Sequence, residues 1–113
     1  RVNGFGTEWM ANDLDVFNQV SLDALVVPKA ESAEDLFALG EQMDALGYRP
    51  DIELWLMVET PTGVLNARAL CSAHPRVGAL LIGTSDLAKC LRVPPTIGRE
   101  GLLQTLSHCV LAA

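Results

Sequence analysis

The chain has 113 residues, half of them hydrophobic, and a formal net charge of −6 at pH 7. Such a chain is long enough for one domain with a modest core and too apolar to be disordered. The negative charge argues against a general nucleic-acid-binding protein, because contacts to phosphate need clustered Lys and Arg. It leaves an anionic small substrate open, since one metal ion and one or two basic residues can invert the local field.

The sequence also shows no pattern typical of a targeting signal or of a disulfide framework. No apolar run approaches the roughly 20 residues of a membrane span, and no apolar segment follows Arg1–Asn3 as in a signal peptide. We therefore expect a cytoplasmic protein. Cys71, Cys90 and Cys109 are odd in number and widely spaced, which favours reduced thiols in the core. The chain begins without Met and stops within a helical pattern, as an excerpt of a longer protein would.

Apolar spacing predicts strands and helices in alternation. In chain order we expect a strand end at 1–3, a helix over 10–21, a strand over 25–28, a helix over 36–46, a strand over 52–58, a helix over 63–73, a strand over 79–83, a helix over 85–91 and a final helix over 102–110. Ser32 and Asp35 form a capping box, Gly47 stops the helix that follows, and Val93–Pro95 breaks the chain. The Trp, Phe and Met positions are expected in the core.

This alternation predicts βαβ units, and therefore an α/β fold with a parallel sheet. Four such units are half of a TIM (β/α)8 barrel, which typically needs about 250 residues. We thus expect residues 1–113 to form a single partial barrel domain. A half barrel leaves strand edges exposed, so we also expect self-association into a homo-oligomer.

Two of the predicted strands end in a carboxylate. The apolar run 54–58 leads directly to Glu59, and the run 79–82 leads through Gly83 to Asp86. The carboxyl ends of parallel strands are where such folds place their chemistry, and one βα unit separates these two acids. Carboxylate oxygens suit Mg²⁺. The alternative is that each acid only caps the helix that follows it.

Two further features lie at the same edge of the predicted sheet. The turn Gly83-Thr84-Ser85 offers backbone N–H groups at a helix N-terminus, which can bind a carboxylate, although a tight turn alone would also explain the glycine. Arg1 ends a strand that faces the same mouth, where a guanidinium could hold a substrate carboxylate or a developing enolate oxygen. An exposed terminal arginine without a role is the alternative.

Lys29 raises the possibility of a second catalytic mechanism, through a covalent intermediate. A lysine at a barrel-strand end can form a Schiff base with a keto substrate. The alternative is a solvated lysine paired with Glu31 or Glu34. His74 and His108 have no spacing typical of metal ligands and are expected at the surface or at helix ends.

Four segments together resemble the citrate lyase beta subunit and malyl-CoA lyase group of the aldolase/citrate lyase superfamily. They are residues 1–3 (RVN), 27–32 (VPKAES), 59–67 (ETPTGVLNA) and 83–89 (GTSDLAK). The resemblance implies a (β/α)8 barrel of which this chain covers about the third to sixth βα units. It also implies a Mg²⁺ site with Glu59 and Asp86 as ligands, Arg1 facing a keto acid, and backbone amides of Gly83, Thr84, Ser85 and Asp86 binding the substrate carboxylate.

The reaction that the resemblance implies is reversible aldol cleavage of a 3-hydroxyacyl-CoA. Citryl-CoA or malyl-CoA would give acetyl-CoA and a 2-keto acid, oxaloacetate or glyoxylate, with Mg²⁺ as the Lewis acid. Two alternatives stay open. One is a divalent-metal aldolase that splits a hydroxy-keto acid to pyruvate, and the other is an inactive barrel fragment that only binds a ligand or partner.

Overall fold

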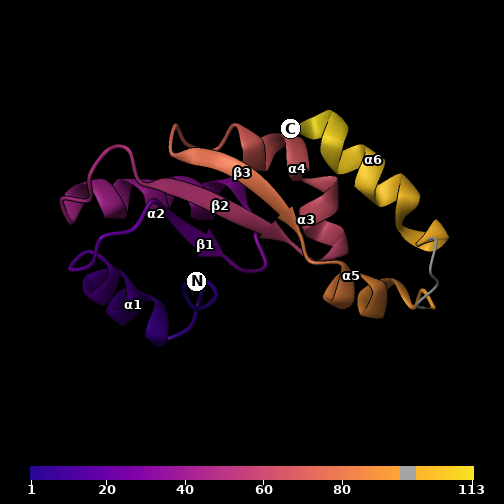
Figure 1. Ribbon diagram of the computed structural model, residues 1–113, viewed down its shortest axis with the longest axis horizontal. Helices are drawn as coiled ribbons and strands as arrows, with labels where there is room; N and C mark the ends of the chain where they lie inside the picture. Colours follow the sequence, from indigo (N-terminus) through magenta and orange to yellow (C-terminus); the bar gives the residue numbers. More distant parts are fainter. Residues whose placement is uncertain (95–98) are drawn as a thin grey trace.

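The structure is a computed structural model and describes residues 1–94 and 99–113. Its centre is a parallel three-stranded sheet in the order β1 (Ala24–Val27), β2 (Glu53–Val58) and β3 (Val77–Ile82), shown in Figure 1. The predicted parallel α/β fold is therefore confirmed. That the sheet is half of a barrel stays a prediction.

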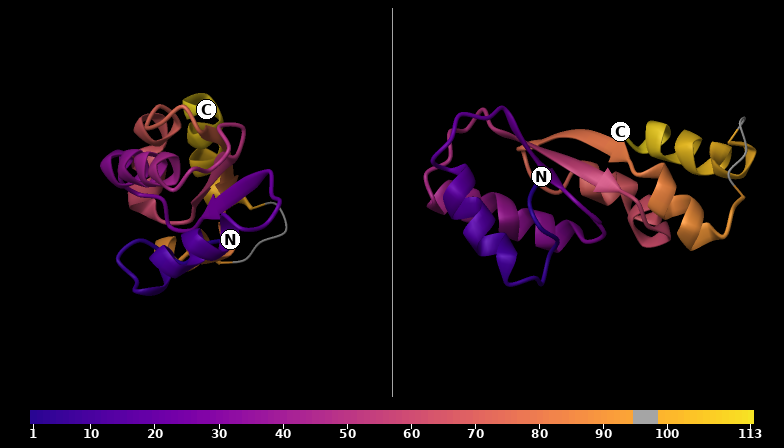
Figure 2. Two further views of the ribbon diagram at one scale, coloured as in Figure 1. Left: turned by 90° about the vertical axis from the view of Figure 1, so that its left-hand side faces the viewer. Right: turned by 60° about the horizontal axis from the view of Figure 1, so that its bottom comes forward.

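Helices connect the strands and extend the molecule beyond them. They are α1 (Trp9–Phe17), α2 (Ala33–Ala45), α3 (Pro61–Leu65), α4 (Ala67–Cys71), α5 (Thr84–Leu91) and α6 (Leu103–Ala112), the last preceded by a 3₁₀ turn over Glu100–Leu102. Across views, α1 and α2 lie toward one end of the elongated molecule and α5 and α6 toward the other (Figures 1 and 2). No described helix is long and apolar enough to cross a membrane. The predicted chain break reaches Pro95, which lies outside the described residues.

One face of the sheet carries the core and the other is largely open. Along β2 the side chains alternate, with Leu54, Leu56 and Val58 fully buried and Trp55 37% exposed. The core joins the covered face to the buried sides of α2 and α4 through Leu25, Val27, Leu36, Leu39, Met43 and Leu70. Trp55 is exposed because no described element covers its side of β2.

Local capping agrees with the sequence at α2. The hydroxyl of Ser32 accepts a hydrogen bond from the amide of Asp35 (3.1 Å), as an N-cap does. At the other end Gly47 adopts a φ of +77°, which glycine tolerates and which stops the helix.

Two predicted helix boundaries are wrong at residues whose side chains contact a distant carbonyl, and one expected strand end does not form. The helix expected over 63–73 is split into α3 and α4 at Asn66, whose side-chain amide donates to the carbonyl of Glu31 (2.7 Å). The helix expected over 10–21 ends at Phe17, because the side chain of Asn18 donates to the carbonyl of Leu46 (2.7 Å). Residues 1–3 form no strand, although the amide of Val2 donates to the carbonyl of Val26 (3.1 Å).

Several predicted environments are also wrong. Trp9, Trp55 and Phe37 were expected in the core but are 56%, 37% and 53% exposed, and Cys90 is an exposed thiol rather than a core residue. His74 was expected at the surface or at a helix end; it lies just after the end of α4, but it is only 8% exposed. The reason is the same throughout: helical and strand spacing identifies an apolar side, but the tertiary packing decides whether another element covers it.

The buried guanidinium of Arg76 closes the end of the sheet where the strands begin. Its Nε donates to Asp44 Oδ1 (2.9 Å), and its Nη1 donates to the carbonyls of Arg49 (2.7 Å) and Ile52 (3.0 Å). Its Nη2 donates to Asp44 and to the carbonyl of Tyr48 (3.2 Å). One side chain therefore provides hydrogen bonds to the carbonyls of the loop that leads into β2, and it ties this loop to the end of α2.

Candidate active site

Glu59 is held at the carboxyl end of β2, on the open face of the sheet. Its side chain is 6% exposed, and Oε1 accepts a hydrogen bond from the backbone amide of Lys29 (3.0 Å). A Cβ atom at Gly83, beyond β3, would lie 2.6 Å from Glu59 Cβ and 2.8 Å from Oε2. Glycine is thus what lets the carboxylate occupy this position. Glu59 does not cap α3, because the Thr60 hydroxyl accepts the bond from the amide of Gly63 (3.2 Å), so the capping alternative is wrong.

Lys29 orients that carboxylate with its main chain. Its φ of 48° lies in the left-handed region, which is uncommon for a residue other than glycine and recurs at functional sites. The expected ion pair with Glu31 or Glu34 is wrong: among described residues, Glu31 accepts from the hydroxyl of Thr60, and Glu34 accepts from Ser32 Oγ (3.1 Å). The Lys29 ammonium is left exposed, and a Schiff-base role stays a prediction.

Asp86 lies in the first turn of α5 and its carboxylate faces solvent. It forms no hydrogen bond or ion pair with another described residue, and no side chain caps α5, so the capping alternative is wrong here as well. The amide of Gly83 donates to the carbonyl of Val58 (2.9 Å), and the first intrahelical bond comes from Leu87. The amide of Gly83 is therefore unavailable to a substrate, contrary to the expectation from the sequence.

The amides of Thr84, Ser85 and Asp86 remain at the start of α5. They precede the first intrahelical bond, so they are the donors that a helix N-terminus leaves for a ligand or water. Their role in binding a substrate carboxylate stays a prediction. Their position beside Asp86 puts these donors within one helical turn of a carboxylate.

Two neighbouring cavities meet at Glu59 and Asp86. The first, here the Arg1 cavity, has a volume of about 470 Å³ and is lined by Arg1, Asn3, Phe5 and Lys29 together with the two acids. The second, the Arg92 cavity, has a volume of about 460 Å³ and adds Thr60, Lys89, Cys90 and Arg92 to Lys29 and the same two acids. The structure therefore brings the three predicted catalytic residues, Arg1, Glu59 and Asp86, to the wall of one cavity. Their chemical roles stay predictions.

The donor set at this junction fits a hard divalent cation. Glu59 and Asp86 supply carboxylate oxygens from the ends of adjacent parallel strands, and Mg²⁺ is usually bound through one or two carboxylates with water or substrate oxygens completing its shell. With Oε1 of Glu59 engaged by Lys29, Oε2 has no hydrogen-bond donor among the described residues. The residues present therefore suit Mg²⁺ with a chelating substrate.

A second acidic cluster lies at the opposite end of the strands. Ligand atoms of Glu41, Asp44 and His74 lie within 4.8 Å of one another. Asp44 is already engaged by Arg76, and Nδ1 of His74 accepts from the amide of Arg76 (3.2 Å). Nε2 of His74 lies 3.6 Å from Glu41. The cluster is accounted for as a charge network around Arg76. This cluster was not predicted from the sequence; the one local signal for it is the three-residue spacing of Glu41 and Asp44 on α2.

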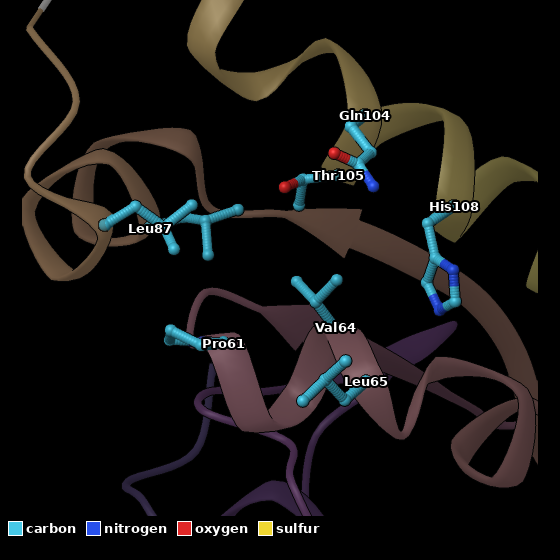
Figure 3. A pocket seen from close by; sticks show the side chains of 8 residues that line it. Pro61, Val64, Leu65, Leu87, Gln104, Thr105 and His108 are labelled. Carbon is cyan, nitrogen blue, oxygen red and sulfur yellow. The ribbon is translucent and has the colours of Figure 1, made fainter.

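An apolar groove of about 300 Å³ opens between α3, α5 and α6 (Figure 3). Its walls are Pro61, Val64, Leu65, Leu87, Leu91, Gln104, Thr105 and His108. Figure 3 shows Val64 and Leu65 of α3 facing Thr105 and His108 of α6. Since its described lining residues include no carboxylate, lysine or arginine, the groove lacks the charged groups that chemistry on an anionic substrate requires.

Comparison with known proteins shows the family to which the chain belongs. The family model described as HpcH/HpaI aldolase/citrate lyase matches residues 1–113. A relative named (3S)-malyl-CoA thioesterase from Cereibacter sphaeroides is 41% identical over 113 residues, 100% of this chain and 37% of the relative. Citrate lyase subunit beta of Escherichia coli is 28% identical over 97 residues, 81% of this chain and 32% of the relative.

A solved structure extends the agreement to three dimensions. The crystal structure of RipC from Yersinia pestis matches with a TM-score of 0.81 and 27% identity, over 99% of this chain and 50% of that chain. The chain thus spans about a third of the length of the curated relatives and half of RipC. Because the family model matches the chain from its first residue to its last, the chain belongs to the HpcH/HpaI aldolase/citrate lyase family.

Proposed function

We propose that this chain is part of a Mg²⁺-dependent carbon–carbon lyase. Its substrate would be a 3-hydroxyacyl-CoA of the malyl-CoA or citryl-CoA type, cleaved to acetyl-CoA and a 2-keto acid. The observation that carries the proposal is the convergence of Arg1, Glu59 and Asp86 on one cavity at the carboxyl ends of β2 and β3. Ligands of open α/β sheets bind at this edge.

Each residue at the junction has a distinct task in this proposal. Glu59 and Asp86 would hold Mg²⁺, which when bound polarises the carbonyl and carboxylate oxygens of the keto acid. The Arg1 guanidinium would donate to the oxygen on which negative charge develops. The amides of Thr84 and Ser85 would hold the keto-acid carboxylate at the start of α5. The amide of Lys29 keeps Glu59 in place throughout.

Thioester hydrolysis is the second candidate, favoured by the 41% identical relative named (3S)-malyl-CoA thioesterase. The two reactions break different bonds. Hydrolysis adds water to the thioester carbonyl and releases the CoA thiol with a free acid. Aldol cleavage breaks the bond between the α and β carbons and leaves the thioester intact in acetyl-CoA. The appearance of a free thiol therefore separates them.

Calorimetric titration of Mg²⁺ and oxaloacetate into the chain tests the site. We expect heat from the wild type that disappears in Glu59→Gln and Asp86→Asn and persists in Glu53→Gln. Glu53 is the matched control because it lies on β2 but lines neither cavity. A folded wild type without heat, or equal heat in all variants, would reject the metal–keto-acid site. With malyl-CoA, glyoxylate without free thiol supports the lyase, and free thiol without glyoxylate supports the hydrolase.

A further inference from the structure

The loop between β1 and α2, residues 28–32, provides the hydrogen bond that holds Glu59. Among the described residues, the backbone amide of Lys29 is the one donor to the Glu59 carboxylate (3.0 Å). Lys29 has a φ of 48°, and a left-handed residue other than glycine keeps that conformation only where surrounding contacts enforce it. The direction of this amide therefore depends on what fixes the chain beside Lys29.

Ala30, which follows Lys29, is fixed between β2 and α3. It is fully buried, and its amide donates to the carbonyl of Met57 (3.1 Å). Its own carbonyl lies so close to Gly63 that a Cβ atom there would be 2.5 Å from the oxygen. This close approach of the two backbones leaves Ala30 no room to move toward α3.

Glu31, the next residue, is bound at both ends of α3. The side-chain amide of Asn66, at the end of the helix, donates to the Glu31 carbonyl (2.7 Å). The hydroxyl of Thr60, at its start, donates to the Glu31 carboxylate. An ionised carboxylate only accepts, so this hydroxyl turns a lone pair toward the amide of Gly63, which donates to it (3.2 Å). Since Thr60 directly follows Glu59, these bonds join the β1–α2 loop to the segment that carries Glu59.

We propose that Glu31 and Asn66 are positioning residues for Glu59. Neither lines the Arg1 cavity or the Arg92 cavity, so they act through the residues that do. They fix the chain that follows Lys29, which keeps the Lys29 amide directed at Oε1 of Glu59 and leaves Oε2 for a metal ion. The effect on metal binding rests on the proposed function, whereas the effect on the Lys29 amide does not.

Hydrogen exchange of the Lys29 amide, followed by NMR, tests this without any ligand. We expect Asn66→Ala to speed exchange of that amide about tenfold, the order expected for the loss of one hydrogen bond. Asn18→Ala is the matched control, because the side chain of Asn18 also donates to a distant carbonyl, that of Leu46, at 2.7 Å. It should lower the midpoint of urea unfolding as Asn66→Ala does, and leave exchange at Lys29 unchanged. Equal exchange rates at Lys29 in the two variants would overturn the proposal.

The carboxylate of Glu31 is tested by its amide analogue. Glu31→Ala removes the acceptor of the Thr60 hydroxyl and should also speed exchange at Lys29. In Glu31→Gln the side-chain oxygen still accepts, so the wild-type rate should return. Glu34→Ala is the control for charge, because it removes the same charge three residues away, where Glu34 accepts from Ser32 instead. The role of Glu31 is rejected if Glu31→Gln behaves like Glu31→Ala, or if Glu34→Ala does.

Titration of Mg²⁺ with oxaloacetate separates this inference from the proposed function. We expect Glu31→Ala and Asn66→Ala each to weaken binding about tenfold, and Asn18→Ala to bind like the wild type. Faster exchange at Lys29 in these two variants, together with a wild type that gives no heat, keeps their role in holding Glu59 and rejects the metal site. Heat that is the same in both variants as in the wild type rejects the positioning role and leaves the proposed function intact.

Discussion

Gly83→Ala tests whether the position of Glu59 depends on the missing side chain of its neighbour. The φ of Gly83 is −79°, which alanine adopts readily, so the backbone is no obstacle. The new Cβ would lie 2.6 Å from Glu59 Cβ, whereas ordinary contacts begin at 3.4 Å. Glu59 Cβ cannot retreat freely, because the preceding Val58 is fully buried in the core. The carboxylate must therefore leave its place.

Two losses follow from that displacement. Overpacking costs about 1–3 kcal/mol, and breaking the bond from the Lys29 amide to a charged carboxylate costs about 1.5–3 kcal/mol. Since relaxation at one contact relieves the other, the two costs do not add in full. We expect the free energy of unfolding to fall by about 2–4 kcal/mol. If Glu59 is a metal ligand, the affinity for Mg²⁺ with oxaloacetate falls more than tenfold. Urea unfolding followed by circular dichroism and calorimetric titration measure the two effects.

Gly78→Ala, on the strand β3 that precedes Gly83, is the matched control. A Cβ there would meet the carboxylate of Glu53, but that side chain is exposed and its end can swing into solvent. We expect a change below about 1 kcal/mol and unchanged binding. Equal destabilisation by the two variants would refute the reasoning about Glu59. Wild-type binding of Mg²⁺ and oxaloacetate by Gly83→Ala would show that Glu59 is not a ligand in this position.

Three further predictions concern stability and thiol chemistry. Arg76→Met should lower the free energy of unfolding by about 3 kcal/mol in urea melts, because several buried carbonyls lose a charged donor. Arg49→Met should lower it by less than about 1 kcal/mol, since the ion pair of Arg49 is exposed. Similar losses in the two variants would contradict the role given to Arg76. Burial raises the pKa of Tyr48, so its contribution to stability is intact below about pH 10 and is lost as the pH rises through the raised value. Tyr48→Phe should cost about 1 kcal/mol at neutral pH through the lost 2.6 Å bond to a carbonyl, and should flatten the alkaline decline; an unchanged decline would exclude Tyr48 as its source. Iodoacetamide should modify the exposed Cys90 first and spare native Cys109, whose pKa is raised by burial, and mass spectrometry showing the reverse order would contradict the burial pattern.

The sequence by itself determined the order of the elements and the positions of the acids. Apolar runs, Ser32 at the start of a helix and Gly47 after it are local signals, and β1, α2 and β2 begin and end within three residues of the predicted bounds. Glu59 and Asp86 could be placed at strand ends for the same reason, since the end of an apolar run in the sequence marks where each strand stops. The four segments that resemble the family added the expected reaction and the expected roles of Arg1, Glu59 and Asp86.

Only the tertiary structure decided which of these residues meet. The capping alternative for Glu59 was excluded only by the contacts that show Thr60 capping α3 and the amide of Lys29 binding Glu59, and that for Asp86 by the absence of a side-chain cap at the described start of α5. These contacts join β1 to β2, and the close approach of Gly83 joins β2 to β3.

The burial of individual side chains was decided at the same level. His74 is buried because its ring packs closely against Gly40 of α2, where it also accepts a bond from the amide of Arg76, and Trp55 is exposed because its side of the sheet is open. The periodicity of one segment predicts which of its residues share a side. Whether that side is buried depends on the other segments that pack against it. The candidate site therefore depends on strands placed side by side: each acid belongs to its own segment, and the packing of the strands brings the two acids to one cavity.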